Sequence, residues 1–525
     1  MKRNPGGAPL PAKCLASPPD SHSEAVFGPC GGLLGTGQGV DTPEGAVAAL
    51  AAVRALRREI LKREILEGGR IDLLATALLD YQLLPFHRAM LDFQSAARDS
   101  CLQLAPRGYG KSTILTITRA VYEILRDPNI RILIASNTQL QAEIFLREIK
   151  FHLALNERLI DVFGRFQDES KWDAREIMVK PRTSSAKEAT VTSVGVGGPV
   201  ASRHYDLIIC DDLVDEENAR TEGQREKVRT WYYKTLSPCL EPHGRLLITG
   251  TRFHHLDLYG WLIKNELAQR HQIIRAIADD GSTPWPEKFS LEWLEEHRRQ
   301  MGSALFNSQY QNDTELMKGN IFREEWFRFY ERPPDPERCD YWIGCDPAAT
   351  RADVIGAGRK ASSDYWTIVV VARERAEEGD NGYGREIYVI DIWRARCTKQ
   401  EYIDELRARN DLYRPLDVLI EAVAAQEYLA QDAEKYMPVE RVKRTKDKIS
   451  RAYWLQAFFE NGQILFPAHQ IQRDEDVWQA LADELVLFPQ AEHDDLFDAL
   501  QTAVEGSLEP RRCGVGVIVF DEIYL

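Results

Sequence analysis

The stretch LQLAPRGYGKST at residues 102–113 decides the fold of the first half of the chain. It reads as a short apolar strand, a loop with two glycines, and a lysine and a serine that begin a helix. In such a loop, backbone N–H groups and the helix N-terminus point at a phosphate, the lysine adds charge and the hydroxyl reaches a magnesium ion. The sequence therefore predicts a nucleotide-binding loop formed by Ala105, Pro106, Arg107, Gly108, Tyr109, Gly110, Lys111, Ser112 and Thr113.

Ala105 departs from the G-x-x-x-x-G-K-S pattern, because a glycine usually occupies its position. Alanine is the smallest replacement, and a residue with a Cβ fits there when its φ is negative. Taken alone, the motif leaves a chance match open, and the rest of the chain has to decide.

Short apolar segments alternate with amphipathic ones around this loop. IRILIAS, YDLIICDD and RLLITGTRF read as strands, and a helical pattern follows the loop and the first of them. Such alternation predicts a parallel sheet covered by helices.

Two of these strands end in polar residues suited to nucleotide chemistry. Asp211 and Asp212 end the strand YDLIICDD, where the first carboxylate would hold magnesium through water and its neighbour would orient the attacking water. Thr249 and Thr251 follow the next strand, at the edge where the γ-phosphate would lie. An acidic strand end facing solvent is the alternative for the two aspartates, and we favour the catalytic interpretation.

The pattern changes after the proline-rich stretch YERPPDPERCD at residues 330–340, where we expect a domain boundary. Strands are expected at residues 341–345, 366–372 and 387–393, followed by a helix and a strand at residues 418–420. Three consecutive strands predict an antiparallel meander, and the helix predicts a crossover to the fourth strand.

Carboxylates gather at the ends of these elements. Asp346 and Glu421 each end a strand, and HDDLFDAL begins a late helix with Asp494 and Asp495, one turn before Asp498. Such residues could bind paired magnesium ions that activate water and stabilise the leaving oxygen in phosphodiester cleavage. Singly, a turn or a helix N-terminus explains them as well; jointly, they favour a metal site.

A locally basic stretch, VERVKRTKDKISRAYW, lies between these acids in a chain whose formal net charge is −15. A solvated face is the usual interpretation of such a run, but beside a nuclease centre phosphate contact is the stronger one. We expect DNA contacts from Arg441, Lys443, Arg444, Lys446, Lys448 and Arg451.

The remaining features bound the class of protein. The 9 cysteines include no C-x-x-C pair, which fits a reducing compartment better than a disulfide framework or a zinc site. No apolar run is long enough for a bilayer, and the first residues lack a signal-peptide core. We expect a disordered arm at residues 1–43 and a helical lead-in at 44–80. The domain of the glycine loop is expected at 81–329, a linker at 330–340 and the domain of the second acidic site at 341–508. A tail at 509–525 follows, and its role is open.

Both sites, in this order, resemble the large terminase subunit of tailed bacteriophages. Besides LAPRGYGKST, the resemblance is carried by VGVGGPVASRHYDLIICDD, LLITGTRFH, FNSQYQNDTELMKGNIF, GCDPAAT, KDKISRAYWLQAFFENGQILFP and HDDLFDAL. It implies an α/β chain with an N-terminal P-loop (ASCE) ATPase domain and a C-terminal RNase H-like nuclease domain. It also implies ATP and Mg²⁺ as cofactors, with Mn²⁺ able to replace Mg²⁺ in the nuclease.

The resemblance implies a motor that translocates double-stranded DNA into a procapsid and cuts the concatemeric genome. Its partners would be the portal protein, the small terminase subunit and further copies of the chain in a ring, in the host cytoplasm and transiently on the procapsid, with no membrane. A helicase-nuclease of DNA repair and an inactive prophage DNA-binding relic are the alternatives. The intact Lys111, Asp211, Asp346 and Glu421 argue against the relic.

The resemblance also assigns roles within the ATPase. Terminases often replace the first glycine and carry an arginine in the loop, so Ala105 reads as a variant, and Arg107 and Arg203 become candidate arginine fingers in cis and in trans. Asp212 stands where the family has a glutamate, so Glu216 and Glu217 remain alternatives for the catalytic carboxylate. Lys111 and Ser112 would bind phosphates and magnesium, Asp211 would be the Walker B acid, and Thr249 and Thr251 would belong to the coupling motif.

The resemblance also concerns the acids of the nuclease and one position before the glycine loop. Asp346, Glu421 and Asp495 match its metal-binding acids, with Asp494 and Asp498 in reserve, and Asp364 also recurs. His87 stands where the family often has a glutamine that reads adenine, so base recognition at this position is open.

Overall fold

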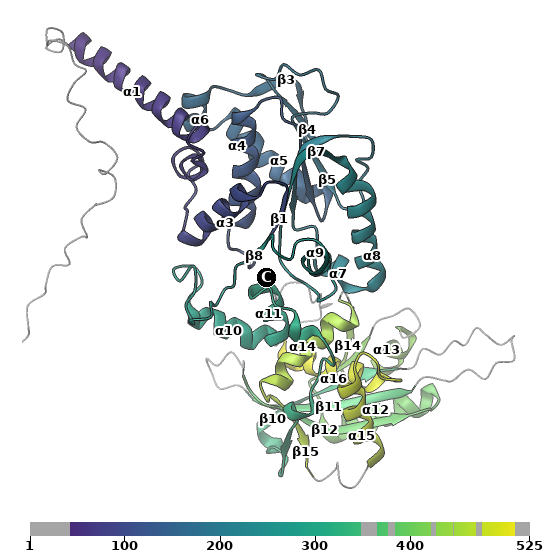
Figure 1. Cartoon of the computed structure of the whole chain (residues 1–525). Coiled ribbons are helices and arrows are strands. Elements are labelled where there is room, and N and C mark those ends of the chain that lie inside the picture. The colour runs from purple at the N-terminus through teal and green to yellow at the C-terminus, as the bar shows by residue number, and fades with distance from the viewer. Residues whose placement is uncertain are drawn as a thin grey trace, which may run out of the picture. The chain divides into compact units, whose positions relative to one another are not determined.

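The computed structural model describes residues 43–347, 365–375, 384–421, 427–444, 446–468 and 475–509 (Figure 1). The expected arm before Pro43, the expected tail after Glu509 and Asp364 lie outside this range. The chain divides into two units, residues 1–63 and 64–525. Among the described residues, no helix combines the length and apolar character needed to span a membrane.

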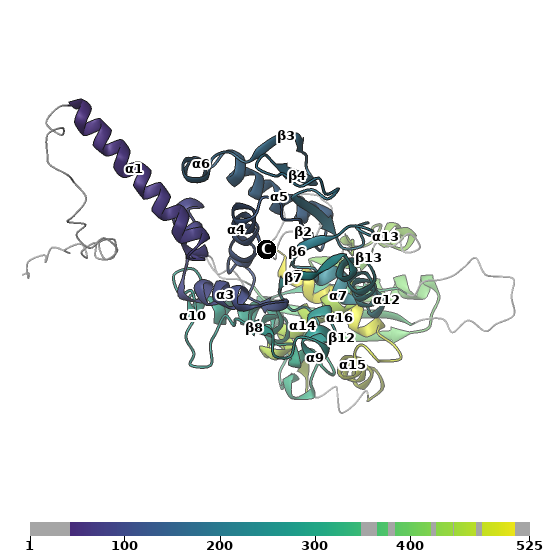
Figure 2. The same ribbon diagram turned by 45° about the horizontal axis from the view of Figure 1, so that its top comes forward.

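The helical lead-in begins with α1 (Pro43–Leu66), a single continuous helix (Figure 2). Its apolar side chains Val47, Leu50 and Leu56 are exposed. The short α2 (Ile71–Leu73), the π-helical η1 (Leu74–Leu78) and α3 (Pro85–Ala96) then lead to the first strand.

The first sheet has eight strands in the order β3-β4-β5-β2-β6-β7-β1-β8. The strands from β5 to β8 in this order are all parallel, which confirms the predicted parallel sheet, whereas β3 and β4 add an antiparallel edge. Their bounds are β1 (Ser100–Leu104), β2 (Ile132–Ser136), β3 (Gln167–Trp172), β4 (Glu176–Val179), β5 (Val191–Gly195), β6 (Tyr205–Asp211), β7 (Leu240–Gly250) and β8 (His271–Ile273).

Helices cover both faces of this sheet (Figure 1). One face carries η2 (Ser112–Ile117), α4 (Thr118–Arg126), α5 (Gln139–Ala154) and α6 (Glu157–Phe163). The other carries α7 (Glu216–Arg220), α8 (Glu222–Trp231), η3 (Tyr232–Leu236), η4 (Ser237–Cys239) and α9 (Leu258–Asn265). Trp231 of α8 and Tyr259 of α9 join Leu104, Ile208 and Ile248 of the strands in one buried cluster, which fixes the strand ends against the helices.

An aromatic cluster packs beside the glycine loop. Phe289, Phe306 and Tyr310 bury Tyr109 of the loop, and the rings of Tyr109 and Phe289 stack at 4.6 Å. The elements that follow β8 are α10 (Leu291–Met301), α11 (Ser303–Tyr310), η5 (Glu315–Met317) and η6 (Glu324–Trp326).

The second sheet has seven strands in the order β14-β13-β10-β11-β12-β15-β9. The expected meander is β10 (Cys339–Asp346), β11 (Trp366–Glu374) and β12 (Ile387–Ala395), and β13 (Asp417–Glu421) returns parallel to β10 after α12 (Lys399–Tyr413). The mixed sheet agrees with the expected RNase H-like class. Its remaining strands are β9 (Arg328–Tyr330), β14 (Val439–Val442) and β15 (Ile464–Pro467).

The start of this sheet differs from the expected boundary. β9 pairs with β15, so residues 328 and 329, expected in the first domain, belong to the second sheet. The strand is short and pairs across more than a hundred residues of sequence, which periodicity does not register. The 3-10 turn η7 (Pro336–Arg338) lies within the proline-rich stretch.

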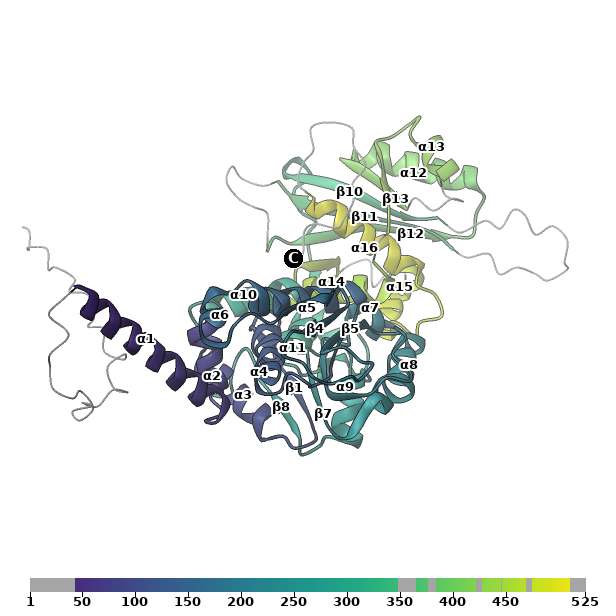
Figure 3. The same cartoon turned by 90° about the horizontal axis from the view of Figure 1, so that it is seen from above.

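Helices pack on both faces of the second sheet (Figure 3). α12 and α13 (Glu427–Ala433) cover Ile343 and Cys345 of β10, whereas α14 (Lys448–Glu460), α15 (Glu475–Leu487) and α16 (Asp495–Leu508) cover the face that carries Trp342. α16 approaches β10 closely, because a Cβ at Gly344 would collide with the backbone of Ala499. This close packing places the first turn of α16 near the carboxyl end of β10.

Candidate functional sites

The glycine loop connects β1 to η2 and bends at two glycines. Gly108 and Gly110 have φ values of +76° and +72°, a conformation that side chains disfavour. Ala105 is not among the described non-glycine residues with positive φ, so its methyl group is compatible with the loop. The Ala105 N–H donates to the Gly250 carbonyl at 3.1 Å, and Thr251 Oγ1 donates to the Ala105 carbonyl at 3.1 Å. The predicted loop and the predicted threonines therefore meet.

Asp211 lies at the end of β6 and is fully buried. It accepts hydrogen bonds from Ser112 Oγ at 3.0 Å and from Thr116 Oγ1 at 2.6 Å. Burial raises the pKa of Asp211, and Asp212 adds to the shift, whereas Lys111 and the two hydroxyls oppose it. The predicted Walker B acid therefore lies beside the predicted magnesium-binding hydroxyl, and Thr116 is a partner that the sequence motifs did not indicate.

Asp212 is held in an unusual backbone conformation, with φ +46°. Its carboxylate forms an ion pair with Lys111 Nζ at 3.0 Å. Its backbone is fixed on both sides, because its N–H donates to the Thr249 carbonyl at 3.0 Å and its carbonyl accepts from the Asn137 N–H at 3.1 Å. Such strain is expected where the surrounding contacts define the position of a functional side chain.

Asn137 is a residue that sequence reasoning missed. It follows β2, the strand between β5 and β6, and its Nδ2 donates to Asp215 at 2.8 Å. A polar residue at the carboxyl end of a central parallel strand was the available signal.

The residues present fit a nucleotide and its metal ion. Asp212 Oδ1 and Thr249 Oγ1 are buried, and neither finds a hydrogen-bond partner within the described parts of the chain. A buried polar atom of this kind is expected to contact a ligand or an ordered water. The lysine, the two hydroxyls and the carboxylates are the donor set that a magnesium–nucleotide complex requires.

The two candidate arginine fingers contact other residues. Arg107 is exposed and donates from Nη1 to Gln309 at 3.2 Å. Arg203 is 39% exposed and forms an ion pair with Glu176 of β4. Glu216 and Glu217, the alternatives for the catalytic carboxylate, lie in the first turn of α7.

In the second sheet, the predicted carboxylates converge from three elements. β10 and β13 are parallel neighbours, so Asp346 and Glu421 end at the same edge of the sheet. Asp495 and Asp498 lie in the first turn of α16, and Thr367 Oγ1 of β11 donates to the Asp495 carbonyl at 3.0 Å. Burial raises the pKa of Asp346 well above its ordinary value, and the charges of Asp498, Asp495 and Glu421 raise it further. These acids therefore share one electrostatic site.

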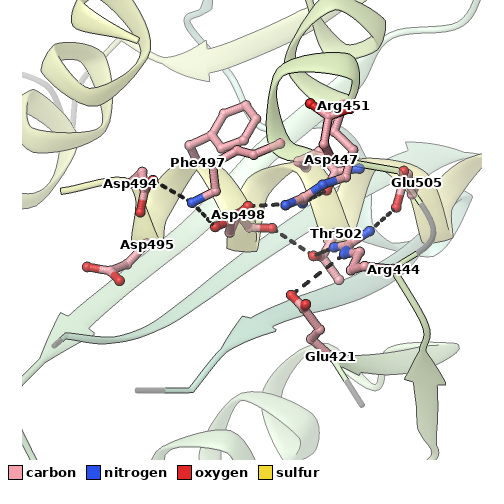
Figure 4. Close-up of polar contacts among 12 residues, drawn as sticks. Glu421, Arg444, Asp447, Arg451, Asp494, Asp495, Phe497, Asp498, Thr502 and Glu505 are labelled. Carbon is pink, nitrogen blue, oxygen red and sulfur yellow. Dashed lines mark hydrogen bonds and ion pairs between the residues drawn. The ribbon is translucent and has the colours of Figure 1, made fainter. Parts of the chain in front are cut away.

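Two cationic side chains of α14 pair with these acids (Figure 4). Lys448 Nζ lies 2.5 Å from both Asp494 Oδ2 and Asp498 Oδ2, and Arg451 Nη1 lies 2.9 Å from Asp498 Oδ1. Burial alone would lower the pKa of Lys448, but Asp498 and Asp494 raise it. The positive charges thus offset the repulsion among the carboxylates.

The predicted DNA-binding stretch consequently divides into two groups. Arg444 contacts Glu421 at 3.7 Å, pairs with Glu505 and donates to Thr502, so that, like Lys448 and Arg451, it faces the acids. Arg441 pairs with Glu434 at 2.8 Å. Lys443 and Lys446 are exposed. The sequence indicated the charge of these residues but not which of them face the acids and which face solvent.

The side chains of the second site have the donor chemistry that a divalent cation requires. Carboxylate oxygens are the ligands that Mg²⁺ and Mn²⁺ prefer. Among the residues that the structure describes, however, no three acidic, histidine or cysteine side chains form a group that could hold a metal ion. Lys448 and Arg444 contact the carboxylates that would provide the ligands.

Glu484 of α15 is a second residue that the sequence motifs did not reveal. It is buried, and its Oε2 accepts from the Leu496 and Phe497 N–H groups at 2.9 and 3.1 Å, which fixes the N-terminus of α16. Arg394 of β12 pairs with its Oε1 at 3.2 Å. Burial raises the pKa of Glu484 to about 7. Glu484 thus positions the helix turn that carries Asp495 and Asp498.

The chain is similar to several known proteins. Residues 343–505 match the family described as the terminase RNaseH-like domain. The large terminase subunit of Enterobacteria phage T3 is 32% identical over 237 residues, which cover 39% of this chain and 39% of the T3 protein. The large terminase of bacteriophage HK97 aligns with 83% of this chain and 99% of its own, with 11% identity and a TM-score of 0.35. The large terminase nuclease of thermophilic phage G20c with bound cobalt aligns with 36% of this chain and 97% of its own, with 18% identity and a TM-score of 0.25.

The match to the T3 protein spans well under half of that protein's length. The T3 protein and the matching domain family nevertheless both indicate a terminase. The family match over residues 343–505 and the T3 relative confirm the predicted resemblance to phage large terminase subunits.

Proposed function

We propose that the chain is a subunit of a motor that hydrolyses ATP to move double-stranded DNA into a phage procapsid and that cuts the concatemeric genome with a two-metal nuclease. ATP hydrolysis belongs to residues 81–329 and DNA cleavage to residues 341–508. The observation that carries the proposal is the coexistence of two acidic sites at the carboxyl ends of parallel strands, one beside a lysine-bearing glycine loop and one in the region that matches the terminase RNaseH-like domain family.

In the ATPase, Lys111 and the loop N–H groups would bind the phosphates, and Ser112 and Asp211 would hold the magnesium ion. The ion, when bound, neutralises charge on the phosphates. Asp212 accepts a hydrogen bond from the attacking water once Lys111 turns to the nucleotide. The contacts of Asp212 with Thr249 and Asn137 keep this carboxylate at the strand end.

In the nuclease, Asp346, Glu421 and Asp495 provide the ligands, with Asp494 and Asp498 beside them. A bound pair of divalent cations would activate water and stabilise the leaving oxygen. Lys448 and Arg444 balance the charge of these carboxylates, and bound cations would take over this role. Mg²⁺ is the proposed ion, and Mn²⁺ can take its place.

The proposed partners follow from the resemblance to the T3 large terminase subunit. They are double-stranded DNA, the portal protein, the small terminase subunit and further copies of the chain in a ring. The proposed place of action is the cytoplasm of the bacterial host, with transient attachment to the procapsid.

The two activities can be tested separately in the full-length chain. Asp346→Ala should abolish Mg²⁺- or Mn²⁺-dependent plasmid cleavage and leave ATP hydrolysis largely intact, because Asp346 belongs to the second site alone. Lys111→Ala should have the opposite effect, so each variant is the other's control. Cleavage that persists in a pure Asp346→Ala preparation would refute the nuclease assignment. Strand unwinding by the wild type without any capsid component would favour the repair helicase-nuclease instead.

A further inference from the structure

His87 connects helix α3 to the glycine loop. The side chain is 1% exposed and lies in the first turn of α3. Its Nδ1 accepts a hydrogen bond from the Leu84 N–H at 3.2 Å, and its Nε2 lies 2.9 Å from the Tyr109 carbonyl of the loop. A neutral imidazole has one donor and one acceptor nitrogen. Because Nδ1 is the acceptor, Nε2 carries the proton and donates to the loop.

The surroundings of His87 favour this neutral form. Burial lowers the pKa of His87, and Lys288 lowers it further, although the bond to the Tyr109 carbonyl opposes the shift. The ring lies 3.9 Å from the Phe86 ring and meets Trp285 edge-on at 5.5 Å, both measured between ring centroids. The imidazole therefore has a defined orientation and a defined tautomer.

The contact fixes a particular peptide group of the loop. The Tyr109 carbonyl and the Gly110 N–H belong to the same planar trans peptide and point in opposite directions. Gly110 has a φ of +72°, and a Cβ at this position would lie 3.2 Å from His87 Nε2. Holding the carbonyl toward His87 thus directs the Gly110 N–H to the other side of the loop. Lys288 Nζ holds the preceding carbonyl, that of Gly108, at 2.8 Å.

We propose that His87 is a positioning residue for the nucleotide, whose Nε2–H holds the 109–110 peptide so that the Gly110 N–H faces the phosphates. The inference rests on the proposed ATPase activity. Both ring nitrogens are engaged within the chain, so His87 does not hydrogen-bond the base as the family's glutamine does.

Two substitutions distinguish the role of the Nε2 position from that of the Nδ1 position. His87→Gln retains an N–H donor at the ε position, whereas His87→Asn retains only groups at the δ position and loses the bond to the loop. Loss of one hydrogen bond weakens binding about 3- to 10-fold. We expect His87→Asn to raise the KM for ATP and the Kd for a fluorescent ADP analogue by this factor, with a smaller change in kcat. His87→Gln should restore most of the affinity.

His152 provides a matched control, because it is also buried and uses both ring nitrogens, with Tyr81 and Asn156 as partners at 2.6 and 3.0 Å. His152→Asn should lower thermal stability as His87→Asn does but leave nucleotide affinity unchanged. Wild-type affinity in His87→Asn, or equal weakening in His87→Gln and His87→Asn, would overturn the inference. A wild-type chain that binds no nucleotide would refute the proposed ATPase itself, and the inference with it.

Discussion

Lys443 and Arg444 are adjacent in sequence, yet their side chains have different surroundings. Lys443 is exposed, whereas the Arg444 side chain is 11% exposed and lies among Glu421, Glu505 and Thr502. A charge on the surface can contact DNA phosphates at little cost, whereas a paired, largely buried charge that moves away to DNA leaves the charges of its partners uncompensated. The neighbours should therefore respond differently to the same substitution.

We expect Lys443→Ala to weaken DNA binding similarly for unrelated sequences and to reduce the slope of log K against log salt by about 0.9, the value for one lost phosphate contact. Arg444→Ala should leave this slope unchanged and instead impair cleavage, because Glu421 and Glu505 lose their cation. Binding isotherms at several salt concentrations, together with plasmid cleavage, distinguish the two effects. A reduced slope for Arg444→Ala would show that its side chain leaves the acids to contact DNA.

For single residues, the sequence predicted the positions of the acidic side chains better than those of the cationic side chains that pair with them. Asp346 and Glu421 end strands, and strand ends can be located from hydrophobic patterning. The direction of Lys448 and Arg451 depends instead on which face of α14 packs against the sheet. The tertiary contacts of α14 decide this, and a charged run does not show them.

Among the elements, α16 is held at two points. Its first turn is bonded to Glu484 of α15, and its middle packs against β10, where Gly344 leaves no room for a Cβ. The position of the helix therefore determines the positions of Asp495 and Asp498.

We expect Glu484→Ala to lower the free energy of unfolding of the nuclease domain by about 3 kcal/mol, because it leaves the Arg394 guanidinium without its buried partner. The same change should reduce Mn²⁺-dependent cleavage, because the N-terminus of α16 loses its acceptor. Urea denaturation and plasmid cleavage measure the two effects. Asp483→Ala is the matched control, since this exposed neighbour on α15 should change stability by no more than about 0.5 kcal/mol. Full cleavage by Glu484→Ala would contradict the positioning role.

The helix after the glycine loop shows that a sequence pattern can predict a helix without predicting its type. Its existence follows from the spacing of Ile114, Ile117 and Val121. Its first turns, η2, are π-helical, however, and this places Thr116 on Asp211. Apolar spacing does not distinguish i→i+5 from i→i+4 hydrogen bonding over so short a segment.

For the molecule as a whole, the order of strands and helices around both sites was predictable, because apolar strand segments could be told apart from amphipathic helical segments by their periodicity. The antiparallel edge formed by β3 and β4 was not, since β3 is largely polar and β4 has only four residues. The pairing of β9 with β15 was missed for the same reason. Short edge strands are defined by the sheet that they join.

The proposed ring leads to a prediction that involves more than one copy. Arg203 is partly exposed and pairs with Glu176 of its own chain, so a trans role requires it to exchange this partner for a neighbour's nucleotide. Arg203→Ala should be inactive alone, because an arginine finger contributes about 10³-fold or more to the rate.

Mixing Arg203→Ala with Lys111→Ala protein should restore some ATP hydrolysis, since one copy supplies the arginine and the other the binding loop. Each variant alone serves as the control for the mixture. If every mixture stays inactive under conditions in which the wild type assembles, Arg203 does not act in trans.

The backbone bonds at the end of β7 have a mechanical consequence. Thr249 is bonded to Asp212, and Gly250 and Thr251 are bonded to Ala105, so three consecutive residues clamp the acid and the loop to one strand. This joint resists any displacement of the loop relative to the acid, because stretching one of these bonds would leave a buried backbone group without a partner. Because β7 is also hydrogen-bonded along its length to β1 and β6, we expect the loop, the acid and the centre of the sheet to behave as one rigid body.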